Sequence, residues 1–188
     1  MPFKSHTQRR KFAELLVKGQ ITPEHRSKEE KRLPPKAATR QPVVDRQALI
    51  ADLTEDLARE YQAIIAYVVY SQVIKGAAYM SIATELETHA KEELDHALII
   101  AKQIDYLGGT PSVSPKPVKL SDQTEALLRF DLENETETIR QYRTRVRQCE
   151  ALGEFAMAEH IREILKDEQE HQIDLATALG EDPPNMTG

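Results

Sequence analysis

The sequence of 188 residues has little of what cross-links a chain or anchors it in a membrane. Its single cysteine, Cys149, excludes an internal disulfide and any Cys-rich zinc or iron–sulfur site. The longest apolar run, residues 63–70, is far shorter than the roughly 20 residues of a membrane-spanning helix. No apolar segment of signal-peptide type follows the basic N-terminal residues. We therefore expect no membrane partner and a reducing, cytoplasmic location.

Proline and glycine are scarce in the body of the chain. The prolines fall before position 43, between positions 111 and 117, and at positions 183 and 184, which leaves two long stretches without any. Gly76 and Gly153 divide these stretches, and apolar residues recur in the resulting segments at spacings of three and four. Such spacing is typical of amphipathic helices. The sequence predicts four long helices, at residues 45–75, 77–107, 121–152 and 154–179, with Ser121 capping the third.

The four helices are predicted to pack as two hairpins. Tight turns near Gly76 and Gly153 would close each hairpin, and the proline-rich residues 110–119 would form a longer crossover between them. Four long helices with one long crossover form a known bundle topology. We expect an all-α, antiparallel four-helix bundle at residues 46–180 and a short tail at residues 181–188. The apolar positions of the first two helices include Leu49, Leu53, Leu57, Ile64, Val68, Ile82, Leu86, Leu94, Leu98 and Ile104.

Charge is divided unevenly along the chain. Residues 1–45 carry 11 Lys or Arg against 5 Asp or Glu, whereas residues 46–188 carry 14 against 26. So acidic a body disfavours nucleic acid and attracts cations. Residues 1–45 are interpreted as a basic N-terminal extension and linker with short helical pieces. Their Arg9, Arg10 and Lys11 cluster is either part of a solvated tail, which we favour, or a contact for nucleic acid or another acidic partner that is unknown.

An internal repeat selects the candidate functional residues. A shift of 75 residues aligns Glu60 and Tyr67 with Glu135 and Tyr142, in the shared pattern E-x-x-x-I-x-x-Y. The same shift aligns residues 91–96 with residues 166–171, in the shared pattern K-[DE]-E-x-[DE]-H. Two motifs in one register are much harder to obtain by chance than either alone. The selected residues are Glu60, Glu93 and His96 in the first half and Glu135, Glu168 and His171 in the second.

These residue types at this spacing are suited to bind two metal ions. Residues three apart lie on nearly the same face of a helix, so the Glu and His of each second motif can bind one ion together. Glu60 and Glu135 can complete and bridge the pair. Four charged carboxylates inside an apolar bundle require cations, because the free-energy cost of their burial and mutual repulsion would otherwise be severe. Mixed carboxylate and imidazole ligands favour iron or manganese over structural zinc.

Two points remain open from the residues alone. The glutamates and histidines could lie on a solvated face, although Glu60 is surrounded by apolar residues at helical spacing. In the third segment Glu133, Glu135 and Glu137 are all candidates, and only the repeat register selects Glu135. The tyrosine of each half lies two turns after its glutamate, so Tyr67 and Tyr142 are expected on the same faces, within reach of the ligands.

This set of residues resembles the di-iron carboxylate site of the ferritin-like superfamily, and its spacing is most similar to that of bacterioferritin. The resemblance covers about residues 46–180, with Tyr67 seven residues after the first ligand as in that family. It implies a ferritin-like bundle in which the six selected residues bind two iron ions. It further implies oxidation of Fe(II) by O2 or peroxide.

The sequence departs from bacterioferritin in two places. The haem-ligand Met of that family is replaced by Leu94, so no haem is expected. The C-terminal residues 181–188 are too short and too rich in proline for the fifth helix of the storage cages. We therefore expect a homo-oligomer that is a dimer or another small assembly rather than a hollow cage.

Three functions are compatible with these expectations. The leading hypothesis is a cytoplasmic ferroxidase whose substrates are Fe(II) and either O2 or peroxide, with Tyr67 and Tyr142 tuning the ligands or supplying an electron. A di-metal oxidase or oxygenase acting on an organic substrate would require an apolar pocket beside the metals. A non-enzymatic helical module that positions the basic extension would hold structural metals or none.

Overall fold

The structure is a computed structural model that describes residues 45–186. The extension predicted at residues 1–45, with its short helical pieces, lies outside the described residues except for Asp45. Asp45 caps the first described helix, and its carboxylate accepts a hydrogen bond from the amide of Ala48 at 2.7 Å.

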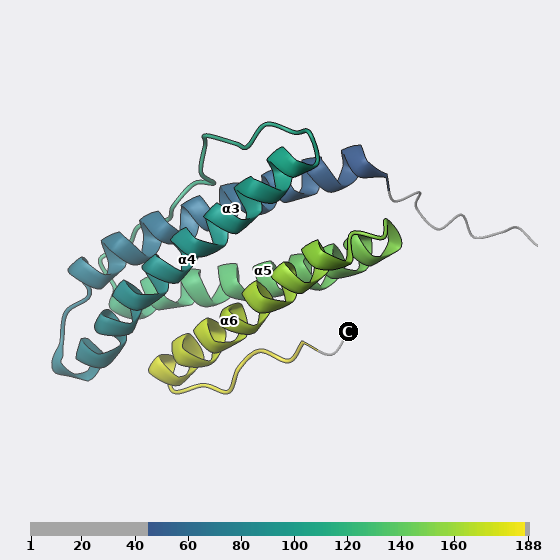
Figure 1. Ribbon diagram of the computed structural model, residues 1–188. Helices are drawn as coiled ribbons and strands as arrows, with labels where there is room; N and C mark the ends of the chain where they lie inside the picture. Colours follow the sequence, from purple (N-terminus) through teal and green to yellow (C-terminus); the bar gives the residue numbers. More distant parts are fainter. Residues whose placement is uncertain (1–44, 187–188) are drawn as a thin grey trace, which may run out of the picture. The chain divides into compact units, whose positions relative to one another are not determined.

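Four long helices make up the described part of the chain (Figure 1). They are α3 (Arg46–Val73), α4 (Met80–Tyr106), α5 (Thr124–Ala151) and α6 (Phe155–Leu179), with a short 3-10 helix, η1 (Ala77–Tyr79), leading into α4. α3 packs along α4 and α5 along α6, and the two hairpins meet through α3 with α5 and α4 with α6. The predicted all-α four-helix bundle is confirmed. Among residues 45–186 no helix is long and apolar enough to cross a membrane.

The turn within each hairpin depends on a glycine. Gly76 has a φ of 119° and Gly153 a φ of 78°, conformations that a residue with a Cβ atom rarely adopts. The prediction that Ser121 caps the third helix is wrong, because the backbone of Gln123 is still extended and α5 begins only at Thr124. The Ser121 hydroxyl instead accepts a hydrogen bond from the amide of Gln123 at 3.0 Å and forms a turn ahead of the helix.

The crossover between α4 and α5, residues 107–123, runs along α3 (Figure 1). Hydrogen bonds join it to this helix at several points. They link the Lys116 amide to the Ala58 carbonyl at 2.9 Å, the Gln62 side chain to the Pro117 carbonyl at 2.7 Å, and the Tyr70 hydroxyl to the Lys119 carbonyl. The crossover is therefore attached to α3 on both sides of Glu60.

Two apolar clusters fill the two ends of the bundle. One combines the start of α3 and the end of α4 with the end of α5 and the start of α6, and the other combines the opposite ends of the same helices. Large members of the first cluster are Leu49, Leu53, Leu57, Ile100, Ile104, Tyr142 and Ile161, and those of the second are Tyr67, Tyr70, Ile82, Leu86, Leu128 and Leu175. Polar side chains occupy the middle of the bundle, between the clusters.

Three of the expected core positions lie on the surface. Val68, Leu94 and Leu98 are 52%, 50% and 61% exposed. Leu94 directly follows Glu93, which points inward, and successive residues on an α-helix are turned by about 100°. α4 therefore carries an apolar inner face and further apolar residues outside it, which a spacing of three and four alone does not separate.

Candidate metal centre

Six acidic and histidine side chains converge in the middle of the bundle. All are at most 3% exposed. Their possible ligand atoms form two overlapping groups, within each of which the atoms lie less than 4.8 Å apart. The six are Glu60 from α3, Glu93 and His96 from α4, Glu135 from α5, and Glu168 and His171 from α6. The structure thus brings together every ligand candidate that the repeat selects.

The two groups share a pair of glutamates. Glu93 and Glu168 belong to both groups, whereas Glu60 belongs only to the group of His96 and Glu135 only to the group of His171. The sequence-based expectation assigned the bridging position to Glu60 and Glu135. In the structure Glu93 and Glu168, rather than Glu60 and Glu135, lie within reach of both histidines.

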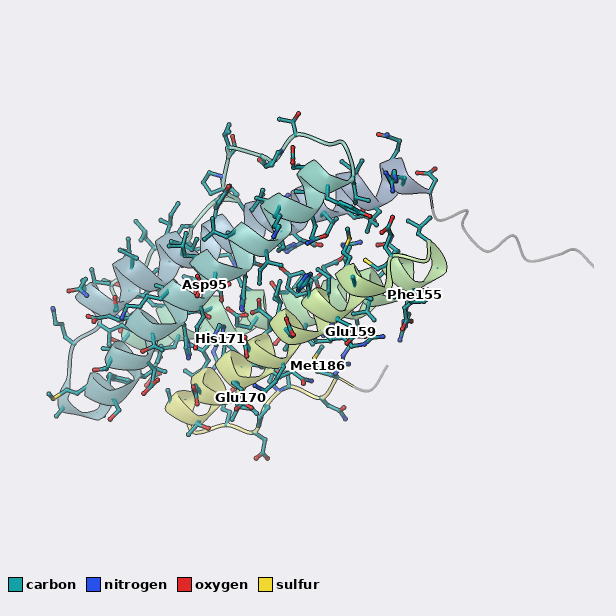
Figure 2. The ribbon with its side chains drawn as sticks, in the orientation of Figure 1. Asp95, Phe155, Glu159, Glu170, His171 and Met186 are labelled. Carbon is teal, nitrogen blue, oxygen red and sulfur yellow. The ribbon has the colours of Figure 1, made fainter. Side chains whose placement is uncertain are left out.

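The two imidazole rings have the same orientation relative to the carboxylates. His96 Nδ1 lies 3.3 Å from Glu93 Oε2 and 3.3 Å from Glu168 Oε1. His171 Nδ1 lies 3.0 Å from Glu93 Oε1 and 3.6 Å from Glu168 Oε2. Figure 2 shows His171 on the inner side of α6, while its neighbour Glu170 lies on the outer side. Both Nδ1 atoms therefore face the space that the carboxylates enclose.

The outward ring nitrogens contact acidic residues of the opposite hairpin. His171 Nε2 lies 2.9 Å from Glu92 of α4, and His96 Nε2 lies 3.5 Å from Asp167 of α6. Glu92 and Asp167 occupy equivalent positions in the repeat. Each carboxylate orients the ring and favours a proton on Nε2, which leaves the Nδ1 lone pair available for a metal ion.

The two tyrosines cross between the repeats. The Tyr67 hydroxyl of α3 donates a hydrogen bond to Glu135 of α5, and the Tyr142 hydroxyl of α5 donates one to Glu60 of α3. Both tyrosines are fully buried. Each tyrosine thus orients the glutamate of the other half, rather than the one that precedes it on its own helix.

Burial separates the three glutamate candidates of α5. The side chains of Glu133 and Glu137 are 59% and 39% exposed, whereas Glu135 is 2% exposed. Glu133 pairs with Lys119 and Glu137 with Arg140, so both carboxylates have partners at the surface. The residue that faces the other acidic groups is the one that the repeat register selects.

Comparisons with known proteins identify the family. The sequence model of the ferritin-like domain of the ferritin family matches residues 50–183. The chain belongs to this ferritin-like family. Among curated proteins it is 24% identical over 135 residues to a bacterial ferritin of Synechocystis, covering 71% of this chain and 86% of that protein. It is 26% identical over 129 residues to a bacterioferritin of Desulfovibrio desulfuricans, covering 68% and 72%.

Solved structures agree with this assignment. A crystal structure of ferritin-like, diiron-carboxylate proteins from Bacillus anthracis has a TM-score of 0.69 and 32% identity, and the match covers 71% of this chain and 96% of that one. A dodecameric thioferritin from Bacteroides fragilis, described as bacterioferritin-related, has a TM-score of 0.67 and 28% identity, with 72% and 86% covered. The ferritin-like fold and the closeness to bacterioferritin that the sequence implied are confirmed.

The donor atoms of this ferritin-like centre fit a pair of divalent cations. Several buried atoms of the cluster make ion-pair contacts within it but no hydrogen bond among the described residues: Glu60 Oε2, Glu93 Oε1, both carboxylate oxygens of Glu168, and His171 Nδ1. A buried polar atom without a partner costs about 1–3 kcal/mol, more when it is charged. Four carboxylates also carry the four negative charges that two divalent ions neutralise. The ligand set therefore matches two ions in both charge and vacant lone pairs.

Protons balance the charges of the cluster when metal is absent. Burial raises the pKa of Glu60 and Glu135 well above the usual glutamate value, and the neighbouring carboxylates raise it further. Burial opposes a charged imidazole at His171, but contacts with Glu168 and Glu93 outweigh it and raise the pKa of His171 to about 11. The pKa of His96 is raised by the same kind of contact. Metal ions must therefore displace protons from the site.

Four buried acidic, histidine or arginine residues of the ferritin-like bundle were not singled out by sequence reasoning. Arg145 Nε lies 2.6 Å from Asp56 Oδ2, and both residues are at most 2% exposed. Asp131 is equally buried, yet its Oδ2 has no hydrogen-bond partner among the described residues. His89 is 3% exposed, and its ring stacks on that of His171 with the centroids 4.0 Å apart. The repeat aligns Asp56 with Asp131, and this match could have identified both residues from the sequence. No motif marks Arg145 or His89.

Proposed function

We propose that the protein is a ferroxidase, in which the six converging residues bind two iron ions and Fe(II) is oxidised by O2 or peroxide. The observation that carries this proposal is a set of buried carboxylate and imidazole atoms that face one another in the middle of the bundle and make no hydrogen bond among the described residues. Bound iron supplies the one-electron step from Fe(II) to Fe(III). Membership of the ferritin-like family and the diiron-carboxylate neighbour favour iron, with manganese as the alternative ion.

Each part of the site has a role in this proposal. Glu93 and Glu168 would bind metal together with either histidine, because both groups of ligands contain them. Glu60 and Glu135 would each bind one ion, with their orientation set by hydrogen bonds from Tyr142 and Tyr67. The tyrosines also lie close enough to the ligands to supply an electron during oxidation. The four carboxylates would stabilise the added positive charge of the ferric pair.

The opening beside the centre disfavours an organic substrate. It holds about 10 Å³, roughly the space of one water molecule, and Arg59, Gln62, Asn134 and Thr138 contribute polar side chains to its wall. An oxygenase would need an apolar pocket for its substrate at this point. A molecule of the size of water, O2 or peroxide fits the opening as it stands.

The experiment is anaerobic loading of the protein with Fe(II), followed by addition of O2. We expect about two iron ions per chain and a transient absorbance on oxidation. Glu93→Gln combined with Glu168→Gln should abolish both, whereas Glu133→Gln should leave both unchanged, because Glu133 lies on the exposed side of α5. Circular dichroism of each variant tests whether it is folded. Tight iron binding without oxidation would overturn the proposed ferroxidase activity. Unchanged iron binding in the double variant would overturn the proposed metal site.

The assembly and location of the protein are part of the same proposal. The thioferritin neighbour is dodecameric and the other relatives are ferritins, so we infer a homo-oligomer that acts in the cytoplasm. Light scattering of the purified chain gives the subunit number directly.

A further inference from the structure

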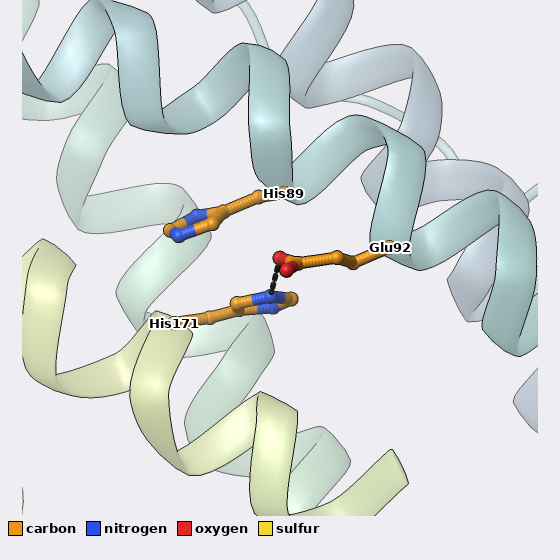
Figure 3. Close-up of side chains that lie close together, drawn as sticks. All are labelled: His89, Glu92 and His171. Carbon is orange, nitrogen blue, oxygen red and sulfur yellow. Dashed lines mark hydrogen bonds and ion pairs between the residues drawn. The ribbon is translucent and has the colours of Figure 1, made fainter.

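The four glutamates of the metal centre face one side of the bundle. All four line the small opening between α3 and α5, and so do the polar residues Arg59, Gln62, Asn134 and Thr138. None of the four lines the larger pocket on the α4/α6 side. There the rings of His89 and His171 stack with their centroids 4.0 Å apart, and the Glu92 carboxylate reaches the His171 ring (Figure 3). A small molecule therefore reaches the carboxylates from the side of α3 and α5.

The two repeats contribute different side chains to the wall of this opening. The repeat aligns Arg59 of α3 with Asn134 of α5 and Ala63 with Thr138, and all four residues line the opening. An arginine carries a permanent positive charge, whereas an asparagine carries none. The two half-sites are built from matching ligand candidates, so the binding of two ions gives no reason for this difference. Arg59 therefore serves something other than the metal ligands.

The fold leaves part of the Arg59 side chain unused. Arg59 is half-buried, and its Nε is buried without a hydrogen-bond partner. Asp56, one turn earlier on α3, is already bound by Arg145 through both carboxylate oxygens. A buried N–H group without an acceptor costs free energy. Arg59 thus keeps a charge and a donor at the wall of the opening that the surrounding protein does not use.

A positive charge at this point opposes the entry of cations. Fe(II) and the Arg59 guanidinium repel each other, so this residue does not assist the loading of metal. The same charge stabilises a molecule that gains negative charge within the opening. The opening holds about 10 Å³, which limits such a molecule to the size of water or of a diatomic oxygen species. An oxidant that accepts electrons from iron has both properties.

We propose that the opening between α3 and α5 binds the oxidant, O2 or peroxide, and that Arg59 stabilises the negative charge that the oxidant acquires. This role rests on the proposed ferroxidase activity. One electron from each Fe(II) passes to the oxygen molecule, which also takes up two protons from solvent. O2 then leaves as H2O2, whereas the O–O bond of H2O2 breaks and two water molecules leave. The Asn134 amide and the Thr138 hydroxyl supply further hydrogen-bond donors from α5.

The first test measures anion binding without oxidation chemistry. The full-length protein is loaded with Co(II) under nitrogen and titrated with fluoride, an anion of about the size of water, while the visible spectrum of Co(II) is followed. Arg59→Met removes the charge and the donors, so fluoride affinity should fall about tenfold. Co(II) affinity should stay equal or increase, because a repelling charge is gone. Absence of fluoride binding in the wild type, or equal fluoride affinity in the two proteins, overturns the proposal.

The opposite changes in the two affinities separate this role from structural damage. Weaker binding of both Co(II) and fluoride in Arg59→Met would show that Arg59 only supports the fold, and the proposal would be wrong. Arg59→Lys keeps the charge and should recover part of the fluoride affinity. Thr138→Val keeps the shape of the side chain and should lose about threefold. The matched control is Arg140→Met, because Arg140 is 58% exposed on α5 and lies outside the opening, and it should bind fluoride as the wild type does.

The second test mixes the Fe(II)-loaded protein rapidly with either O2 or H2O2. In Arg59→Met the rate constant for oxidation should fall about tenfold with the oxidant that uses the opening. A loss with one oxidant alone identifies that molecule, and no loss with either contradicts the proposal. A wild type that binds Co(II) and fluoride but does not oxidise Fe(II) refutes the ferroxidase and leaves an anion site at Arg59. Equal oxidation rates in wild type and Arg59→Met refute the role of Arg59 and leave the ferroxidase standing.

Discussion

The two hairpins of the bundle are equivalent at the metal centre and different one turn away from it. Asp56 in α3 and Asp131 in α5 occupy equivalent positions of the repeat, and both are buried. Asp56 is paired with Arg145, whereas the position equivalent to Arg145 in the other half is Tyr70, whose hydroxyl donates to a crossover carbonyl instead. One buried carboxyl is thus held as an ion pair, and the other has no counter-ion among the described residues.

This difference shows which parts of the repeat the chemistry constrains. The ligand candidates, the tyrosines and the outward partners Glu92 and Asp167 keep their equivalents, because two equivalent groups of ligands require equivalent partners. The residues one turn away need only fill space and satisfy their polar atoms. They can therefore differ between the halves without changing the centre.

The largest test of the comparison removes the arginine. Arg145→Met leaves Asp56 buried without its counter-ion, and we expect the free energy of unfolding to fall by about 3–5 kcal/mol. Tyr70→Phe, at the equivalent position, loses one hydrogen bond and should cost only about 1 kcal/mol. Urea unfolding of the metal-free proteins measures both. Similar losses in the two variants would show that the halves do not differ in this way.

The next test concerns a feature that the halves share. Tyr67→Phe and Tyr142→Phe each remove the hydrogen bond that orients one glutamate of the centre, so each should lower Co(II) affinity about tenfold and by the same factor. Tyr106→Phe, at a residue 64% exposed, is the control and should have no effect. An effect confined to one of the two buried tyrosines would contradict the equivalence of the half-sites.

The smallest effect is expected at Asp131 and depends on pH. Burial raises the pKa of Asp131 well above its ordinary value, as does the charge of Glu93. A raised pKa adds stability below the unfolded-state pKa, and this contribution is lost as the pH rises through the folded-state value. The asparagine side chain of Asp131→Asn does not titrate. The free energy of unfolding of this variant, relative to that of the wild type, should therefore increase by about 1 kcal/mol as the pH rises from about 4 to about 8. Thermal unfolding across this range measures the difference. If the stability of Asp131→Asn relative to the wild type instead decreases with rising pH, the raised pKa of Asp131 is contradicted.

The sequence was sufficient for the helices and for the ligand candidates, for a physical reason. Helix periodicity and turn glycines are local signals, and Gly76 and Gly153 do adopt the backbone conformations that only glycine reaches easily. The repeat then extends these local signals to all four helices. If the two hairpins are equivalent, their equivalent residues face the same central axis of the bundle. Glu135 could be separated from Glu133 and Glu137 only in this way.

The remaining features depend on contacts between distant segments. Arg145 lies 89 residues from Asp56, and no spacing rule connects them. The tyrosines were expected near the glutamates, but which glutamate each one reaches depends on how the hairpins meet. The exposure of Val68, Leu94 and Leu98 likewise depends on which apolar face of a helix is turned inward.

The crossover along α3 has a consequence for local unfolding. Its hydrogen bonds to α3 begin at Glu55, which accepts from the Lys116 side chain before Glu60, and end at Tyr70, beyond Tyr67. α3 therefore cannot open around Glu60 unless the crossover detaches from it, so both segments must open together as one cooperative unit. Amide hydrogens of this part of α3 should thus exchange with solvent in step with those of the crossover, whether or not metal is bound.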